Sequence, residues 1–359
     1  LCFFVYGLER PKLLLLSAGM YGLSLYCYAT IWPFVPLILI LQAVYCLFYK
    51  KLSFSRELLF SILLLGILAL PLFLFLLVNM GVIPEICLPF LSIPRLLYMR
   101  SGEISFQNIP ENFQNLWQIL STQTDGLAWN ATDRFGIFYP ITLPFFFIGL
   151  LLLIRNMIRG IRHKAFCPEV LLLVQLLAGF LLGLLIHVNI NRVNCLFLPM
   201  LLIAAYGLYF LFTRFSKYLL LIPLLIYSVY FIQFEQYYFT DYAQEIAGYF
   251  CDGLENAVQY AMQSNGTINV TSGANYARVM FYSREDVNDY ISTVQYTNYP
   301  SAFLDVASFG RFCFYYDLNN LDPTAAYIVE ASNDPSIFTN AGYQVQLFGN
   351  FYAAIPPAS

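Results

Sequence analysis

Residues 187–194 concentrate hydrogen-bonding side chains between two long apolar runs. The stretch reads HVNINRVN and contains one histidine, three asparagines and one arginine. A planar guanidinium can hold a phosphate through two parallel N–H···O bonds, and amides beside it add donors and acceptors. The alternative is an arginine that only reaches the membrane surface while its stem stays in an apolar layer. We predict a phosphate site, with Arg192 on the phosphate and His187, Asn189, Asn191 and Asn194 supporting it.

A second polar stretch, residues 123–130 (QTDGLAWN), lies in the long connection 79–140. Asp125, Trp129 and Asn130 offer a carboxylate, a stacking face and an amide, so we predict that they help to bind a substrate. The alternative for any one carboxylate here is a solvated surface group. A connection of about 60 residues is longer than joining two helices requires. We expect it to contain an amphipathic helix at the membrane interface, such as residues 112–120.

A third stretch, residues 26–33 (YCYATIWP), is rich in aromatic residues. One interpretation is an aromatic belt at a membrane interface. The other is a rim for a lipid headgroup or a sugar, in which Tyr26 and Tyr28 supply hydroxyl groups and ring faces. We include both tyrosines among the predicted substrate-binding residues.

Several function classes are disfavoured by what the apolar runs lack. Their interiors carry no Asp, Glu, Lys or Arg, whereas ion-coupled transporters and proton pumps usually need such groups near the middle of the bilayer. No CxxC pair or Cys/His cluster indicates a metal centre. We expect no cofactor, although a divalent metal stays open, and no nucleic-acid partner.

These polar stretches must be positioned by apolar runs, which dominate the composition. The chain is 59% hydrophobic and 11% charged, with a mean hydropathy of +0.65. A run of about 20 apolar residues matches the hydrocarbon thickness of a bilayer, and lipid favours helices because it offers no partner to exposed backbone groups. We predict seven membrane-spanning helices at residues 13–28, 33–49, 58–78, 141–154, 170–187, 195–213 and 218–234.

Basic residues gather in alternate connections between these runs. The connections before the first run, and after the second, fourth and sixth, hold 11 of the 18 Lys and Arg. The remaining seven are Arg95, Arg100, Arg134, Arg192, Arg278, Arg284 and Arg311. The positive-inside rule places the basic connections in the cytoplasm. Residues 79–140, the turn at 187–194 and everything after residue 234 would then lie outside.

The chain after residue 234 has a different character. Residues 235–359 contain 13 acidic residues against three arginines, no lysine, and 15 of the 28 tyrosines. We predict two domains, a transmembrane helical domain at 1–234 and an extracytoplasmic small α/β domain at 235–359, which has enough residues for a core of its own. Expected helices are 237–263 and 334–340, and expected strands are 267–271, 326–330, 344–348 and 350–355.

Two further features leave alternatives open. Cys251 and Cys313 share the C-terminal domain and form either a disulfide or two free thiols. The chain begins at Leu1, and residues 1–7 are too few to span a bilayer. We therefore expect them to be the end of an earlier span, with catalytic residues upstream.

Three stretches resemble the bacterial multi-span glycosyltransferases of the C-type fold, in the protein O-mannosyltransferase and aminoarabinose-transferase-like group (family 39-like). They are GLSLYCYAT at 22–30 with PLIL at 36–39, QTDGLAWN at 123–130 with FGIFYPITLP at 135–144, and NINRVN at 189–194 with Pro199 and AYG at 205–207. The resemblance covers about residues 1–235. It implies transfer of a sugar from a polyprenyl-phosphate donor to a glycan, lipid or protein acceptor outside the cytoplasm, in the bacterial cytoplasmic membrane and in contact with its lipids. The acidic residue that serves the family as general base lies near its N-terminus, so no catalytic residue is assigned here.

Two other functions fit the same sequence. A surface-polysaccharide polymerase or ligase shares the lipid-phosphate chemistry. A non-enzymatic protein, anchored by the spans, would bind carbohydrate through the acidic, tyrosine-rich domain.

Overall fold

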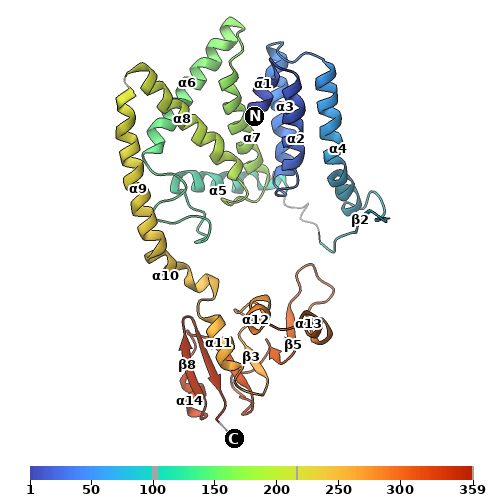
Figure 1. The fold of residues 1–359 in the computed structure, drawn as a ribbon, viewed down its shortest axis with the longest axis vertical. Helices are drawn as coiled ribbons and strands as arrows, with labels where there is room; N and C mark the ends of the chain where they lie inside the picture. The colour runs from blue at the N-terminus through green and yellow to red at the C-terminus, as the bar shows by residue number, and fades with distance from the viewer. Residues whose placement is uncertain (99–103, 216, 358–359) are drawn as a thin grey trace. The chain divides into compact units, whose positions relative to one another are not determined.

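The computed structural model describes residues 1–98, 104–215 and 217–357, and the chain divides into two compact units (Figure 1). Unit 1, Leu1–Glu235, is helical. Unit 2, Gln236–Ser359, combines helices with a sheet, and its boundary lies one residue beyond the predicted one. Arg100 lies outside the described residues.

Unit 1 is a bundle in which the chain runs back and forth between two ends. Its helices are α1 (Cys2–Gly7), α2 (Lys12–Ser24), α3 (Ile31–Phe48), α4 (Arg56–Asn79), α5 (Ile109–Thr122), α6 (Thr142–His163), α7 (Leu171–Leu185), α8 (Phe197–Arg214) and α9 (Leu221–Phe239), the last of which continues into unit 2. Short 3-10 turns, Pro168–Val170 and Asn194–Leu196, lead into α7 and α8.

Five stretches of the described chain are helices long and apolar enough to cross a membrane, where the sequence predicted seven. They are α3, α4, α6, Pro168–Leu185 and Asn194–Arg214. The helix expected at 13–28 ends at Ser24, and its 13 residues extend only about 20 Å at 1.5 Å per residue. The helix expected at 218–234 forms as α9, but its last turns carry Gln233, Glu235 and Gln236.

Close helix contacts in unit 1 depend on glycine. At the crossing of α6 and α8, a side chain on Gly149 would overlap the carbonyl of Ile203, and one on Gly207 would overlap the carbonyl of Phe145. Small residues let membrane helices approach until their backbones touch, which provides packing energy where no hydrophobic effect drives association.

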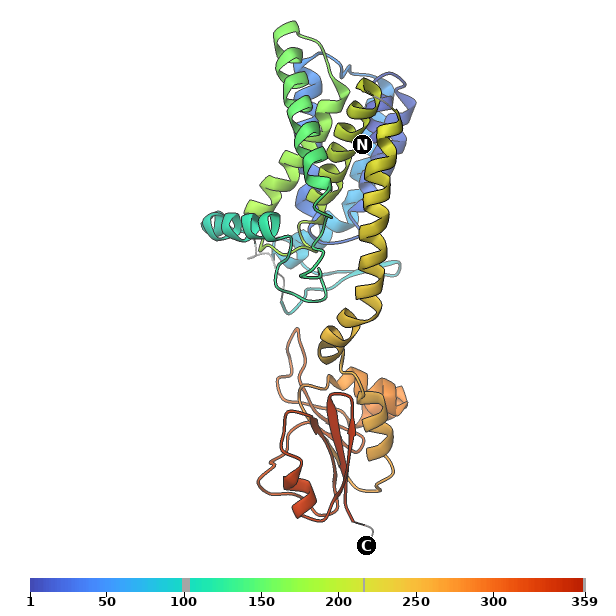
Figure 2. The same ribbon diagram turned by 90° about the vertical axis from the view of Figure 1, so that its left-hand side faces the viewer.

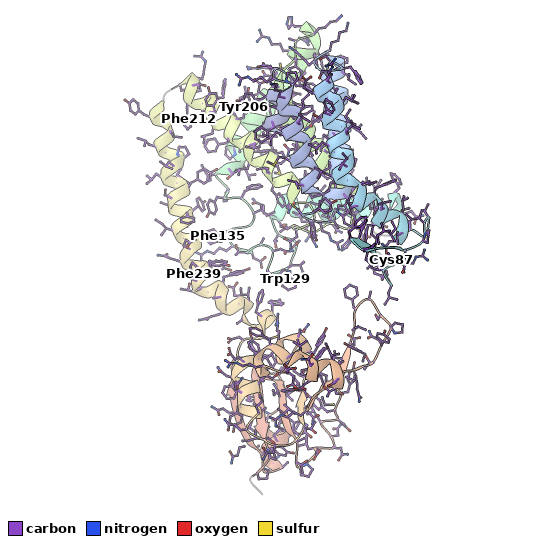
Figure 3. All side chains as sticks on the ribbon, turned by 45° about the vertical axis from the view of Figure 1, so that its right-hand side comes forward. Cys87, Trp129, Phe135, Tyr206, Phe212 and Phe239 are labelled. Atoms are coloured by element: carbon purple, nitrogen blue, oxygen red, sulfur yellow. The ribbon has the colours of Figure 1, made fainter. Side chains whose placement is uncertain are left out.

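The two ends of unit 1 differ in composition (Figures 1 and 3). The basic end holds the connections α1–α2, α3–α4, α6–α7 and α8–α9, with Phe212 near it. The polar end holds residues 80–98 and 104–140, among them Trp129 and Phe135, and the turn between α7 and α8 (Figure 3). A hairpin of β1 (Ile86–Leu88) and β2 (Leu91–Ile93), which the sequence did not predict, also belongs to the polar end.

Helix α5 lies across the polar end of the bundle (Figures 1 and 2). It is the amphipathic helix predicted at 112–120, extended at both ends. Leu116 and Ile119 are buried against α7 and the turn that follows α7, whereas Phe113 and Trp117 are exposed. An amphipathic helix suits this position because one face packs on the bundle and the other face can lie at the membrane surface.

Unit 2 is a mixed sheet with helices on both faces. Its strands are β3 (Ile268–Val270), β4 (Gln295–Tyr296), β5 (Val306–Phe309), β6 (Phe312–Cys313), β7 (Ala326–Glu330), β8 (Gln344–Phe348) and β9 (Phe351–Ile355), in the spatial order β4-β5-β6-β3-β7-β9-β8. Strand β3 pairs in parallel with β6 and β7, and the other neighbours are antiparallel. The predicted partly parallel α/β domain is therefore present.

Alternating residues of β7 face two separate cores. Ala326 and Ile328 pack with residues of α11 (Leu254–Ala261) and α12 (Tyr276–Ser283) on one face. Tyr327 and Val329 pack with Phe338 of α14 (Ser336–Asn340) and with Tyr343 on the other face. Because a strand has a side-chain period of two, one short run buries both faces. The remaining helices of this unit are α10 (Asp241–Ala247) and α13 (Val287–Thr293).

The prediction of a single helix at 237–263 is wrong. The helix α9 ends at Phe239, and α10 and α11 are separate. Cys251 has a left-handed φ of 57°, and Gly253 has φ of 83°. A side chain on Gly253 would overlap the carbonyl of Phe348, so the approach of the β8–β9 hairpin requires glycine there.

The disulfide alternative is also wrong, because Cys251 and Cys313 are both free thiols. Cys251 is buried, and its Sγ accepts a hydrogen bond from Nη1 of Arg278 at 2.6 Å. The Sγ of Cys313 contacts the carbonyl of Tyr315. The two thiols therefore contact different groups and not each other.

Candidate functional site

The two polar stretches predicted from the sequence meet at the polar end of unit 1. Asp125 Oδ2 accepts hydrogen bonds from the side chain of Asn130 at 2.7 Å and from the backbone N–H of Ile190 at 2.9 Å. The side chain of Asn191 donates to Oδ1 of Asn130 at 2.6 Å. The connection between α5 and α6 is thus tied to the turn between α7 and α8. We call residues 123–130 and 187–194 together the polar clasp.

The first half of the clasp is shaped by local turn chemistry. Gln123 follows α5 with a left-handed φ of 61°, and Gly126 has φ of 77°. Asp125 Oδ1 accepts from the N–H of Leu127 at 3.1 Å, which forms a tight turn of the kind that Asp favours. The side chain of Gln123 accepts from the N–H of Phe138 at 2.8 Å, which closes the loop.

The second half is shaped by alternating burial. Ile186, Val188 and Ile190 are buried in the same core as α5 and α7, with Val193 beyond them. An extended stretch sends alternate side chains to opposite sides. His187 is accordingly exposed and Asn189 half-buried, while Asn191 is exposed in the turn that follows.

Arg192 is held by its own turn. Its backbone N–H donates to Oδ1 of Asn189 at 2.9 Å, and its Nη1 donates to the carbonyl of His187 at 3.3 Å. Arg192 as a whole is half-buried. Asn189 therefore positions the backbone of Arg192, and Arg192 supplies the positive charge of the clasp.

Asp125 acts as a structural tie in this geometry. Its two oxygens accept from Leu127, Asn130 and Ile190. A carboxylate that accepts several N–H bonds is strongly oriented, because bonds to a charged acceptor are stronger than neutral ones. Its predicted contact with a substrate stays a prediction.

The predicted residues outside these contacts have other positions. The hydroxyl of Tyr26 donates to the carbonyl of Leu68 at 2.6 Å, which joins the end of α2 to α4 rather than to the clasp. Tyr28, Trp129 and Asn194 are exposed. Trp129 lies on the clasp at the polar end of unit 1 (Figure 3).

Sequence reasoning missed an apolar cavity beside the clasp. It has a volume of about 530 Å³ and is lined by α5, α6, α7 and α8. Leu120 and Ser121, which precede the first half of the clasp, line it, and so does Leu196, which follows the second half. The signal for it was the amphipathic pattern of residues 112–120, whose apolar side needed a place to pack.

Asn112 was also missed. It is 1% exposed, and its side chain donates to the carbonyl of Leu184 at 3.0 Å. The last carbonyls of a helix lack partners within the helix. Asn112 supplies one for α7, and the backbone N–H of Ser105 supplies another at the carbonyl of Leu185. The sequence offers little signal for it, because α5 contains two asparagines, Asn112 and Asn115, and the pattern does not tell which of them is buried.

The clasp combines one guanidinium, several amides and an exposed histidine with an adjoining apolar cavity. Within the described residues, no group of three or more His, Cys, Asp or Glu is arranged to hold a metal ion. The arrangement offers hydrogen-bond donors and one positive charge to a ligand that is anionic at one end and apolar at the other. Searches for similarity find no known protein family, curated protein or solved structure that matches this chain.

Proposed function

We propose that unit 1 binds a polyprenyl-phosphate-linked sugar at the polar clasp and takes part in transferring the sugar to an acceptor. The observation that carries the proposal is the position of the cavity. Arg192, a half-buried residue, and Leu196, which lines the apolar cavity of about 530 Å³, lie four residues apart on the same short stretch of chain. A lipid phosphate has an anionic head and a long apolar tail, so it matches both parts.

The main contribution of the clasp is to stabilise the negative charge that develops on the leaving phosphate. In the transfer, an acceptor hydroxyl oxygen forms a bond to the anomeric carbon, the bond from that carbon to the phosphate oxygen breaks, and its electron pair stays on the phosphate. The hydroxyl proton passes to a general base, and no residue of this chain is assigned that role. Fixed donors aimed at the developing charge lower the barrier because they need no reorganisation during the reaction.

Arg192 is the proposed phosphate contact, and the other clasp residues hold it. Asn189 anchors its backbone, and the carbonyl of His187 orients its guanidinium. Asn191 and Asn130 link this turn to Asp125. The imidazole of His187 and the side chain of Asn194 are exposed and would contact the sugar or the acceptor.

The side of the membrane is part of the same proposal. The concentration of Lys and Arg at the basic end supports a cytoplasmic position for that end. The clasp and unit 2 would then face outward from a bacterial cytoplasmic membrane, where lipid-linked sugars are used.

The test is the affinity of the purified full chain for a polyprenyl phosphate in detergent micelles. A hydrogen-bonded contact to a charged group contributes about 1.5–3 kcal/mol, so Arg192→Ala should weaken binding roughly 10- to 150-fold. Arg192→Lys should recover only part, because an ammonium cannot make the planar two-point contact. Arg95→Ala removes the same charge from an exposed position of the polar end and should change little. Wild-type affinity in Arg192→Ala would show that the clasp is not the phosphate site.

A further inference from the structure

Helix α6 has two unlike faces near its C-terminal end. Leu153 and Gly160 are buried, and a side chain on Gly160 would crowd the carbonyl of Ala165. Arg155, Arg159 and Arg162 are all exposed on the other side. Spacings of four and three residues place the three guanidinium groups along one side of the helix.

The basic side of α6 carries a shallow groove on the helix surface that is open to its surroundings. The groove has a volume of about 360 Å³, and every residue that lines it comes from α6. Leu151, Ile154 and Ile158 form its apolar part, and the arginines form the part nearer the end of the helix. The helix end extends beyond its neighbours at the basic end of unit 1 (Figures 1 and 2).

The local charge is net positive. Residues 142–169 contain four Lys and Arg and a single acidic residue, Glu169. Cations in the last turn of a helix stabilise it through the helix dipole, an effect that falls off within that turn. Arg155 lies two turns before the end of α6, so the dipole does not account for the whole stripe.

We propose that this face of α6 binds an anionic glycerophospholipid of the leaflet at the basic end. Its phosphate would lie among Arg155, Arg159 and Arg162, and an acyl chain would lie along Leu151 and Ile158. Positive charge immediately beyond the apolar part of a membrane helix matches the headgroup layer, where each Lys or Arg attracts anionic lipid. The site is separate from the polar clasp, because its first arginine, Arg155, lies 13 residues after Thr142, which is about 20 Å along α6 from the polar end.

The experiment titrates the purified full chain in neutral detergent with phosphatidylglycerol and with phosphatidylcholine of identical acyl chains, and counts bound lipids by native mass spectrometry. The wild-type chain should prefer phosphatidylglycerol. The triple variant Arg155→Gln/Arg159→Gln/Arg162→Gln should bind it on the order of 100-fold more weakly, since each basic group near the surface contributes about a factor of five. All three side chains are exposed, so the variant should keep the wild-type thermal unfolding temperature.

A matched control distinguishes lipid binding at this site from general attraction by the positive charge of the basic end. Arg10→Gln/Lys50→Gln/Arg214→Gln removes the same charge from exposed positions of the other basic connections, and it should keep the preference. Equal losses in the two triple variants, or no loss in either, would overturn the proposal. Ile158→Gln should weaken long-chain phosphatidylglycerol more than the dihexanoyl form, and an equal effect on both would also count against the groove.

Discussion

The carboxylate of Asp125 accepts a hydrogen bond from the backbone N–H of Ile190 at 2.9 Å, although 65 residues separate them in the chain. This contact joins two connections that leave different pairs of helices. Arg192 lies two residues beyond Ile190, so its position relative to the apolar cavity depends on a carboxylate that belongs to the other half of the clasp.

Replacing Asp125 should loosen the second half of the clasp. Asp125→Ala removes a charged acceptor from Ile190 and Asn130, and a bond of this type contributes about 1.5–3 kcal/mol when both partners are held. We expect amide exchange at residues 188–193 to accelerate about tenfold or more by hydrogen–deuterium exchange. Asp133→Ala is the control, because Asp133 makes only a long contact, 3.4 Å, with Thr124. Unchanged protection in Asp125→Ala would show that packing alone holds the turn.

Gly207→Ala should destabilise unit 1. The new methyl would overlap the carbonyl of Phe145 and the backbone of Gly149, and overpacking typically costs about 1–3 kcal/mol. The thermal unfolding temperature in detergent should fall. Gly66→Ala is the matched control in α4, where nothing lies within 4 Å of the new methyl, and better helix propensity should stabilise it by up to about 1 kcal/mol. Equal behaviour of the two variants would contradict the close contact between α6 and α8.

Tyr343 should couple the stability of unit 2 to alkaline pH. Its hydroxyl donates to the carbonyl of Asp322 at 2.5 Å, and burial, followed by Tyr327 and Asp322, raises the pKa of Tyr343 to about 12. The unfolded chain, with a tyrosine pKa of about 10, loses this proton first, so the contribution of Tyr343 is present below pH 10 and declines as the pH rises toward 12.

Tyr343→Phe tests this coupling in a soluble fragment from Thr240 to Ser359, unfolded by urea and followed by circular dichroism. At pH 8 the variant should be less stable by about 0.5–1.5 kcal/mol, the value of a typical hydrogen bond. The difference from wild type should shrink between pH 10 and 12. Tyr315→Phe, at a 60% exposed position, should show neither effect. A difference that stays constant with pH would contradict the raised pKa.

The orientation of the chain can be tested by labelling. In a variant without the exposed cysteines Cys2, Cys27 and Cys87, single cysteines replace Ser53 or Ser272, which are both exposed. Because the basic connections are expected inside, a membrane-impermeant maleimide should label position 272 in intact cells and position 53 only after permeabilisation. The opposite pattern would invert the proposed topology.

Strands were predictable where local pattern and turn agree. The runs at 326–330 and 344–348 have the observed bounds of β7 and β8, and Gly349, with φ of 51°, makes the turn into β9. Strands β4 and β6 have two residues each, so they carry no periodicity that a sequence can reveal. Gly248 and Gly253 are local signals against one continuous helix at 237–263, whereas the close approach of Phe348 to Gly253, from almost 100 residues away, is a tertiary contact.

The clasp was predictable in its parts and not in its assembly. The density of Asn and His around Arg192, and of polar groups around Asp125, indicated two sites. Their contact depends on the turn that orients Asp125 and on the burial of Ile190, which are both tertiary effects. The same limit applies to Tyr26, whose aromatic neighbours indicated a rim, whereas its hydroxyl joins two helices.

The bond from Asn112 to the carbonyl of Leu184, together with that from Ser105 to Leu185, gives the last two carbonyls of α7 partners within the protein. A helix whose final carbonyls rely on solvent must finish in the headgroup layer, since an unsatisfied carbonyl is costly in hydrocarbon. Here the partners come from the protein itself. The hydrocarbon boundary can therefore shift past the end of α7 without exposing an unpaired carbonyl of Leu184 or Leu185, and this side of the bundle should tolerate bilayers that differ in thickness.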